Sequence, residues 1–324
     1  MRNLASTLAP GLALGLALAP GWAAAQDEPL SIEFVAGIVG IPFYTSMECG
    51  ARDAARDLGV EMNWSGPPQW DLALQLPLLQ AAVERDPDGV VLAPTDPVAL
   101  VTEVEALMAR DIPVVTVDGS LAEPVDVQNM RTNNREAGGL AADAMAEAIG
   151  GTGSVLIVAL NPGVPANQER ADGFVERLQA DHPGITVLPI EYPGTDQNRA
   201  AEIVAAAIQA NPDLAGIYTT HSNAAVGASS AVIGAGRQGE IRIIAYDADP
   251  QQVRDLRDGI YDALVVQSPY REGYDSVALV TQILRGEVDP ATLEDVHYPP
   301  MVVATRDNLD SPEVQGALYV DSCE

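Results

Sequence analysis

Short, uninterrupted apolar runs recur along the chain and alternate with segments of helical periodicity. The runs cover residues 89–92, 113–117, 155–159, 241–245 and 263–266. A strand that is apolar without alternation is buried on both faces, as in a parallel sheet. Apolar residues three or four positions apart predict helices over 47–58 and up to Met108, the latter with Asp96 as its N-cap. Strands alternating with helices predict an α/β fold of doubly wound parallel sheets.

The pattern occurs twice. The stretch from Asp86 resembles the stretch from Asn211, and each leads into an apolar strand that ends in an aspartate, Asp118 in the first half and Asp247 in the second. An earlier segment from Gly50 pairs in the same way with one from Gly173. The sequence therefore predicts two similar lobes, each with an acidic residue at the carboxyl end of a corresponding strand.

Ligands of open parallel sheets bind beyond the carboxyl ends of the strands, and domain interfaces are favoured ligand sites. Two such lobes would face each other across one cleft. The residues predicted to line it are Phe43, Tyr44, Asp118, Arg170, Asn223, Asp247 and Gln267. Aromatic faces combined with carboxylate, amide and guanidinium groups suit a ligand that is apolar on its faces and hydroxylated at its edge, such as a sugar or polyol.

Composition limits the partners. The 324 residues include 46 Asp+Glu and 17 Lys+Arg, and the formal net charge is -29. A chain this acidic is a poor candidate to bind nucleic acid or an anionic membrane. All the basic residues are arginine, so a catalytic or phosphate-binding lysine is excluded. The G-x-G-x-x-G match at 234–239 ends a predicted helix and precedes a strand, so it is predicted to be a helix end and turn rather than a dinucleotide site.

The N-terminus predicts export. Arg2, the apolar stretch 8–19 and the small residues at 23–25 have the order of a secretory signal peptide. No Cys follows the cleavage site, so a lipid anchor is not expected. The remaining cysteines, Cys49 and Cys323, either pair in an oxidising compartment or remain separate, with Cys49 as a small core residue. We expect a protein of the bacterial periplasm.

The three histidines, His182, His221 and His297, are isolated in the sequence, and no metal site or cofactor is expected. None of them is among the predicted site residues, which argues against acid–base catalysis and for a protein that is not an enzyme. Trp64 and Trp70 are either additional stacking surfaces or packing residues of a loop.

The chain resembles the ribose/galactose-type periplasmic sugar-binding proteins of ABC transporters through these blocks, in this order: IPFYTSMECGARDAARDLGV, PDGVVLAPTD, IPVVTVD, NQERADGF, TTHSNAAVGA, IIAYD and VVQSPYREG. The resemblance implies a type I periplasmic binding protein, a clamshell of two lobes with a three-strand hinge. Its division would be a signal peptide at 1–25, an N-terminal lobe of 26–130 plus 268–302, and a C-terminal lobe of 131–267 plus 303–324. The crossovers would lie near 129–133, 267–268 and 302–304.

The family's ligand-binding positions match the seven predicted residues, and each also has a structural interpretation. The aromatic pair could cap a core, Asp118 could make a turn, Arg170 could form a surface ion pair, Asn223 could cap a helix, and Gln267 could support the hinge. Ribose binders commonly carry Asn at the position of Ile41 and Arg at that of Gly119. The resemblance therefore does not identify the sugar.

The resemblance implies a solute-binding protein that delivers a monosaccharide or polyol to an ABC transporter permease. A chemoreceptor or sensor kinase is a compatible further partner, nucleic acid is not a partner, and a monomer is expected. Two alternatives differ from sugar uptake: a sensor for another hydroxylated ligand, such as a signalling furanose or a nucleoside, and an exported sugar-processing enzyme that uses Asp118 and Asp247 as a carboxylate pair.

Overall fold

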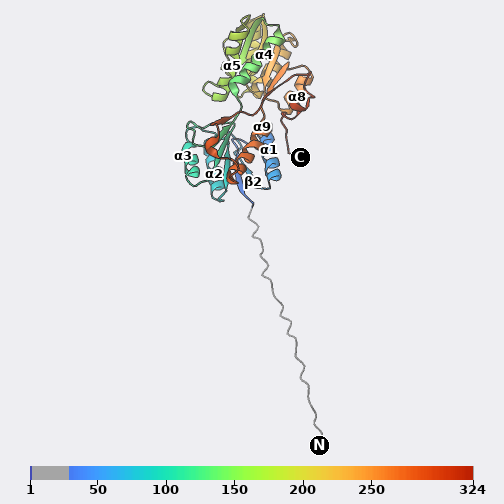
Figure 1. Ribbon diagram of the computed structural model, residues 1–324. Helices are drawn as coiled ribbons and strands as arrows, with labels where there is room; N and C mark the ends of the chain where they lie inside the picture. Colours follow the sequence, from blue (N-terminus) through green and yellow to red (C-terminus); the bar gives the residue numbers. More distant parts are fainter. Residues whose placement is uncertain (2–28, 324) are drawn as a thin grey trace.

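The computed structural model describes Met1 and residues 29–323, and the predicted signal peptide lies outside the described residues apart from Met1. Two α/β lobes lie one above the other and are joined by several passages of the chain (Figure 1). Each lobe is built on one six-stranded sheet, in the orders β11-β5-β4-β3-β1-β2 and β12-β10-β9-β8-β6-β7. The first five strands of each half therefore have the same order, which confirms the predicted doubly wound fold and its duplication.

The first lobe contains sheet A and the helices packed on it. Its strands are β1 Ser31–Val35, β2 Glu61–Ser65, β3 Gly89–Leu92, β4 Val114–Val117, β5 Gln128–Met130 and β11 Val296–His297, all paired in parallel. Its helices are α1 Pro42–Leu58, α2 Leu72–Val83, α3 Val101–Met108 and α9 Pro269–Leu284, with a 3-10 turn at Pro290–Thr292. The central strands β3 and β4 are buried along their whole length, as their unbroken apolar sequence predicts.

The second lobe contains sheet B. Its strands are β6 Gly153–Val158, β7 Ile185–Val187, β8 Leu214–Thr219, β9 Arg242–Tyr246, β10 Ala263–Val266 and β12 Val302–Ala304, of which only β12 pairs antiparallel. Its helices are α4 Asn134–Ile149, α5 Pro165–Asp181, α6 Gln197–Ala210, α7 Ser222–Gly234, α8 Pro250–Arg257 and α10 Pro312–Gln315. α7 ends at Gly234 and is followed by Gly236 and Gly239 at positive φ, which confirms the predicted helix end and turn.

The start of α3 differs from the prediction. The Asp96 carboxylate accepts from the backbone N–H groups of Val98 and Ala99, at 2.9 and 2.8 Å, and these residues form a turn. The helix begins only at Val101, after Leu100. The Asp96 carboxylate does accept from backbone N–H groups, as predicted, but it stabilises a local Asx-type turn and not the start of the helix.

The chain passes between the lobes after β5, after β10 and between β11 and β12, because these strands belong to different sheets from the elements that follow them. The last residues depart from the predicted division: residues 302–317 pack on the second lobe, whereas Val320 and Cys323 contact α1 of the first. Among the described residues no helix is both long and apolar enough to cross a bilayer.

Candidate functional site at the junction of the two lobes

Asp118 and Asp247 occupy equivalent places in the two lobes. Asp118 follows β4 and Asp247 follows β9, and these strands hold the same position in their sheets. Both aspartates have a left-handed backbone, with φ of 57° and 76°, which Asp adopts more readily than most residues. Each backbone N–H donates to the neighbouring strand, to the carbonyl of Met130 or of Val265, at 3.0 Å in both cases. The duplicated acidic strand ends predicted from the sequence are present.

Asp118 is held by an aromatic residue of α1. Pro42 occupies the first turn of that helix, where its missing N–H costs nothing, and Tyr44 follows directly. The Tyr44 hydroxyl donates to Asp118 Oδ2 at 2.7 Å. Burial raises the pKa of Asp118, the hydrogen bond from Tyr44 and the charge of Arg170 oppose that rise, and the negative charge of Asp247 adds to it. Asp118 therefore experiences charges from the opposite lobe.

Asp247 belongs to a network with Gln267 and Arg170. The Gln267 amide donates to Asp247 Oδ1 at 2.8 Å and accepts from the Arg170 guanidinium at 3.2 Å. Arg170 is 6% exposed, and it also donates to Asn134 Oδ1 and to the Thr220 carbonyl while lying 3.7 Å from the ring centroid of Tyr246. Arg170 is thus a buried, oriented donor and not the surface ion-pair partner that the sequence also allowed.

Two of the chain passages between the lobes meet beneath this network. Thr132, after β5, donates its hydroxyl to Gln267 Oε1 at 2.8 Å and lies 3.3 Å from Glu272 Oε1 in the first turn of α9. Glu272 is fully buried. Burial, with the charge of Asp118, raises the pKa of Glu272 well above its usual range, which favours a neutral carboxyl group.

Aromatic rings connect the two acidic positions. Phe43 packs edge-on against Tyr44 and against Tyr319, with centroids 5.3 and 5.7 Å apart, and the Tyr319 hydroxyl donates to Asp247 Oδ1 at 3.3 Å. Trp70 is 47% exposed with its centroid 6.4 Å from that of Tyr44. Trp64 instead packs on Phe34 of the first sheet, so its role is packing.

Asn223 lies apart from this cluster. It is in the first turn of α7 and accepts from Gln197 Nε2 at 2.9 Å. The residue after β8 that lies beside Arg170 is His221, because Arg170 donates to the adjacent Thr220 carbonyl. Burial and the charge of Arg170 lower the pKa of His221 to about 4. A histidine therefore lies beside Arg170, although none was among the residues predicted from the sequence.

His221 is the N-cap of α7, with Nδ1 accepting from the Ala224 N–H at 3.4 Å. The ring proton is then on Nε2, which is buried and has no hydrogen-bond partner in the described structure. Sequence reasoning missed His221 because it looked for pairs of histidines, and missed Tyr319 because it lies beyond the last predicted strand. The available signal for His221 was its position two residues before the predicted Asn223, in the segment that follows β8.

Six of the seven predicted residues form one connected cluster: Phe43, Tyr44, Asp118, Arg170, Asp247 and Gln267. It combines carboxylate acceptors from both lobes, a guanidinium donor and aromatic surfaces, which is the chemistry needed to hold hydroxyl groups. Between residues 29 and 323 no group of three or more His, Cys, Asp or Glu side chains is placed to hold a metal ion.

Comparison with known proteins identifies the family. Residues 32–287 match the family model described as a periplasmic binding protein domain. The chain belongs to this family. Among its relatives, the ribose import binding protein of Bacillus subtilis (strain 168) is 25% identical over 273 residues, which cover 83% of this chain and 87% of that protein.

Solved structures of ABC transporter solute-binding proteins resemble this periplasmic binding protein over most of its length. The protein from Agrobacterium vitis, bound with α-D-tagatopyranose, is 30% identical with a TM-score of 0.80, covering 90% of this chain and 99% of that one. The protein from Agrobacterium radiobacter, in complex with D-arabinose, is 26% identical with a TM-score of 0.79 and the same coverage. These likenesses establish the type I clamshell fold and its membership in the sugar-transport branch of the family.

Proposed function

We propose that this periplasmic binding protein is the solute receptor of an ABC importer and binds a monosaccharide at the junction of its lobes. One observation carries the proposal: Asp118 and Asp247, at equivalent strand ends of the two lobes, belong to one cluster with aromatic and guanidinium groups. A sugar hydroxyl can donate to a carboxylate and accept from an arginine, while the C–H face of the ring packs on an aromatic surface.

We assign ligand contacts to Phe43, Tyr44, Asp118, Arg170, Asp247 and Gln267, the clustered residues, and add His221 as a candidate donor. The free Nε2–H of His221 supports its inclusion, since a buried donor without a partner is rare and a ligand hydroxyl would satisfy it. Asn223 stays a candidate through its position after β8, and Gln197 is its present partner.

In this proposal the sugar closes the lobes around the three chain passages, and the closed form docks on a membrane permease. The protein acts as a monomer in the periplasm after removal of residues 1–25. The hydrogen bond from Thr132 to Gln267 supports this view, because it joins two of the passages next to the acidic cluster. Binding leaves the sugar chemically unchanged.

Calorimetry tests the site. Wild-type protein, freed of bound ligand by partial unfolding and refolding, is titrated with D-ribose, D-arabinose, D-tagatose and D-allose, and the tightest sugar is used with Asp118→Asn and Asp247→Asn. Each variant should bind more than about tenfold more weakly, a loss of about 1.4 kcal/mol or more. Asp310→Asn, which alters an exposed ion pair with Arg257 at 3.0 Å, is the control and should bind as wild type.

Two results would contradict the proposal. If neither aspartate variant weakens binding, the site assignment fails. If the sugar recovered after long incubation is chemically altered, the protein is an enzyme and the carboxylate pair needs a catalytic interpretation.

A further inference from the structure

The C-terminal segment connects the lobes a fourth time. After β12 the chain packs on the second lobe, where Leu309, Val314 and Ala317 join the hydrophobic core and Asp310 pairs with Arg257. It then runs alongside the junction to α1, and the C-terminus lies next to that helix (Figure 1). This connection is independent of the three passages that link strands of the two sheets.

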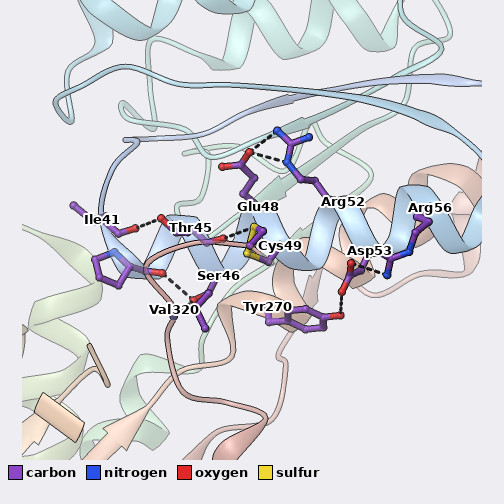
Figure 2. The surroundings of a disulfide bond; sticks show 12 residues. Ile41, Thr45, Ser46, Glu48, Cys49, Arg52, Asp53, Arg56, Tyr270 and Val320 are labelled. Atoms are coloured by element: carbon purple, nitrogen blue, oxygen red, sulfur yellow. Dashed lines mark hydrogen bonds and ion pairs between the residues drawn. A yellow bond between two sulfur atoms is a disulfide. The ribbon is translucent and has the colours of Figure 1, made fainter. Parts of the chain in front are cut away.

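The segment changes lobes at a single peptide bond. The N–H of Tyr319 donates to the Ala248 carbonyl of the second lobe at 3.3 Å, whereas the N–H of the next residue, Val320, donates to Ser46 Oγ of α1 at 2.8 Å. Three residues later Cys323 forms a disulfide with Cys49, also on α1 (Figure 2). Residues 320–323 are exposed, so the disulfide, rather than burial, anchors the end of the chain.

Tyr319 is placed between the two lobes by this path. Its side chain is 3% exposed, its ring packs edge-on against Phe43 of the first lobe, and its hydroxyl donates to Asp247 of the second. Burial and the charge of Asp247 raise its pKa well above the usual range, so the hydroxyl keeps its proton and remains a donor. Gln267 donates to the same carboxylate oxygen. Asp247 is therefore fixed from two sides.

We propose that the disulfide-tethered segment 318–323 is a working part of the ligand site, in which Tyr319 is a positioning residue that orients the Asp247 carboxylate toward the sugar. The proposal deepens the proposed function and rests on it. Tyr319 acts through Asp247, and the Cys49–Cys323 bond keeps the tyrosine at the junction.

The tether also limits how far the lobes separate. Four residue steps join Tyr319 to Cys323, and a fully extended chain of that length spans at most about 14 Å. When the lobes open, the hydrogen bond from Val320 to Ser46 can break, but the disulfide cannot. Tyr319 therefore stays within reach of both lobes in the open form, and it does not have to be recaptured from solvent when a sugar binds.

Tyr319→Phe tests the positioning role, because it removes the hydroxyl and keeps the ring. With the tightest-binding sugar among D-ribose, D-arabinose, D-tagatose and D-allose, affinity should fall about three- to tenfold, the usual effect of one hydrogen bond. The melting temperature of the ligand-free protein should fall only slightly, because Gln267 still donates to Asp247. Tyr274→Phe is a matched control, since the Tyr274 hydroxyl lies 3.3 Å from Asp57 outside the site, and it should bind as wild type.

A double-mutant cycle distinguishes action through Asp247 from a general packing effect. In the Asp247→Asn background, Tyr319→Phe should cause less than a twofold further loss, because the group it orients has been changed. Equal losses in both backgrounds, or unchanged affinity of Tyr319→Phe alone, would overturn the positioning role.

The tether is tested with Cys49→Ser/Cys323→Ser. This variant should release the sugar several-fold faster, and in ligand-free protein its residues 316–323 should exchange amide hydrogens faster than in wild type. Unchanged exchange would refute the tether, and unchanged sugar release would refute its part in binding. If wild type binds none of the four sugars by calorimetry, the proposed function fails, and the positioning role fails with it. The exchange experiment then still decides whether the segment is held at the junction.

Discussion

At the residue scale, the buried polar groups of the site differ in how many hydrogen bonds they make. Each of the three guanidinium nitrogens of Arg170 has one partner, in Asn134, Thr220 and Gln267. His221 has only its capping bond, and its Nε2 is without a partner in the described structure. A buried neutral imidazole beside a guanidinium is costly to protonate, and this cost makes the stability of the protein depend on pH.

His221 should lower the stability of the fold as the solution becomes more acidic. Its pKa is about 4 in the folded protein, against 6.5 in an unfolded chain. Below pH 6.5 the unfolded chain therefore binds the proton more readily, and between pH 6.5 and 4 the free energy of unfolding loses on the order of 3 kcal/mol through this group. His221→Asn, which keeps a cap for α7, should remove that loss in urea titrations at pH 7 and pH 4. A loss of the same size in both proteins would show that His221 does not titrate as described.

Site residues could be predicted from the sequence only where a polar residue stood at a recognisable position, such as the end of a strand. Asp118 and Asp247 were found because each follows an apolar strand, and Arg170 because it lies within the NQERADGF block. His221 and Tyr319 were missed because their roles depend on tertiary contacts. His221 follows the Thr220 carbonyl, which accepts from Arg170. Tyr319 lies in the segment that Cys323 ties to Cys49, 274 residues earlier in the chain. Local sequence shows where a residue lies along the chain, but not which distant groups it contacts.

At the element scale, a close crossing of two helices recurs at equivalent places in the two lobes, and glycines make it possible. A Cβ atom on Gly50 of α1 would overlap the Tyr270 carbonyl of α9, and one on Gly173 of α5 would overlap the Arg135 carbonyl of α4. Gly50 and Gly173 are the two residues that the internal comparison of the sequence paired. The sequence therefore showed that glycine occurs at matching positions of the two halves. It did not show the reason, which is the contact between two helix backbones.

Gly50→Ala should destabilise the first lobe by about 1–3 kcal/mol, because the methyl group forces α1 and α9 apart. Gly234→Ala, at the end of α7, is the control: it meets no atom within 4 Å, and it should stabilise the protein by up to about 1 kcal/mol through lower chain entropy. Urea unfolding followed by circular dichroism measures both. Equal stability of the two variants would mean that the crossing is loose.

The five strands that were given by residue range were predicted to within two residues of their ends, since short apolar runs rich in Val and Ile favour strands over helices. Helix starts were less certain. Asp96 followed by Pro97 has the expected signature of a helix start, but the chain makes a turn there and the helix begins at Val101. The family resemblance placed residues 303–324 in the second lobe, and the Cys49–Cys323 bond, one of the two possibilities for these cysteines, joins the end of that segment to the first.

At the scale of the whole molecule, charge is the dominant feature. The formal charge of -29 makes the folded protein repel itself. Most of its ion pairs, such as those of Arg52 with Glu48 and of Arg135 with Glu176, are exposed and contribute little to stability. Added salt therefore weakens the exposed ion pairs, which contribute little, and reduces the larger repulsion among the excess acidic side chains.

The melting temperature should rise as NaCl is increased from 0.1 to 1 M, over which the screening length falls from about 10 to about 3 Å. Scanning calorimetry at pH 7.5 measures the change, and the same series in KCl should give the same result if screening is the cause. A melting temperature that stays constant or falls would show that self-repulsion does not limit stability.

The pairing of α1 with α9 has a consequence for the order of folding. All the parallel strands of the second lobe, with α4 to α8, lie in one continuous stretch, residues 134–266, whereas the first lobe needs α9 to complete its helix pair and β11 to complete its sheet. Contacts between distant parts of the chain form slowly, because a large loop must first close. The lobe that emerges first during synthesis is therefore the last to finish folding, and its unpaired α1 surface is the one that a chaperone would meet.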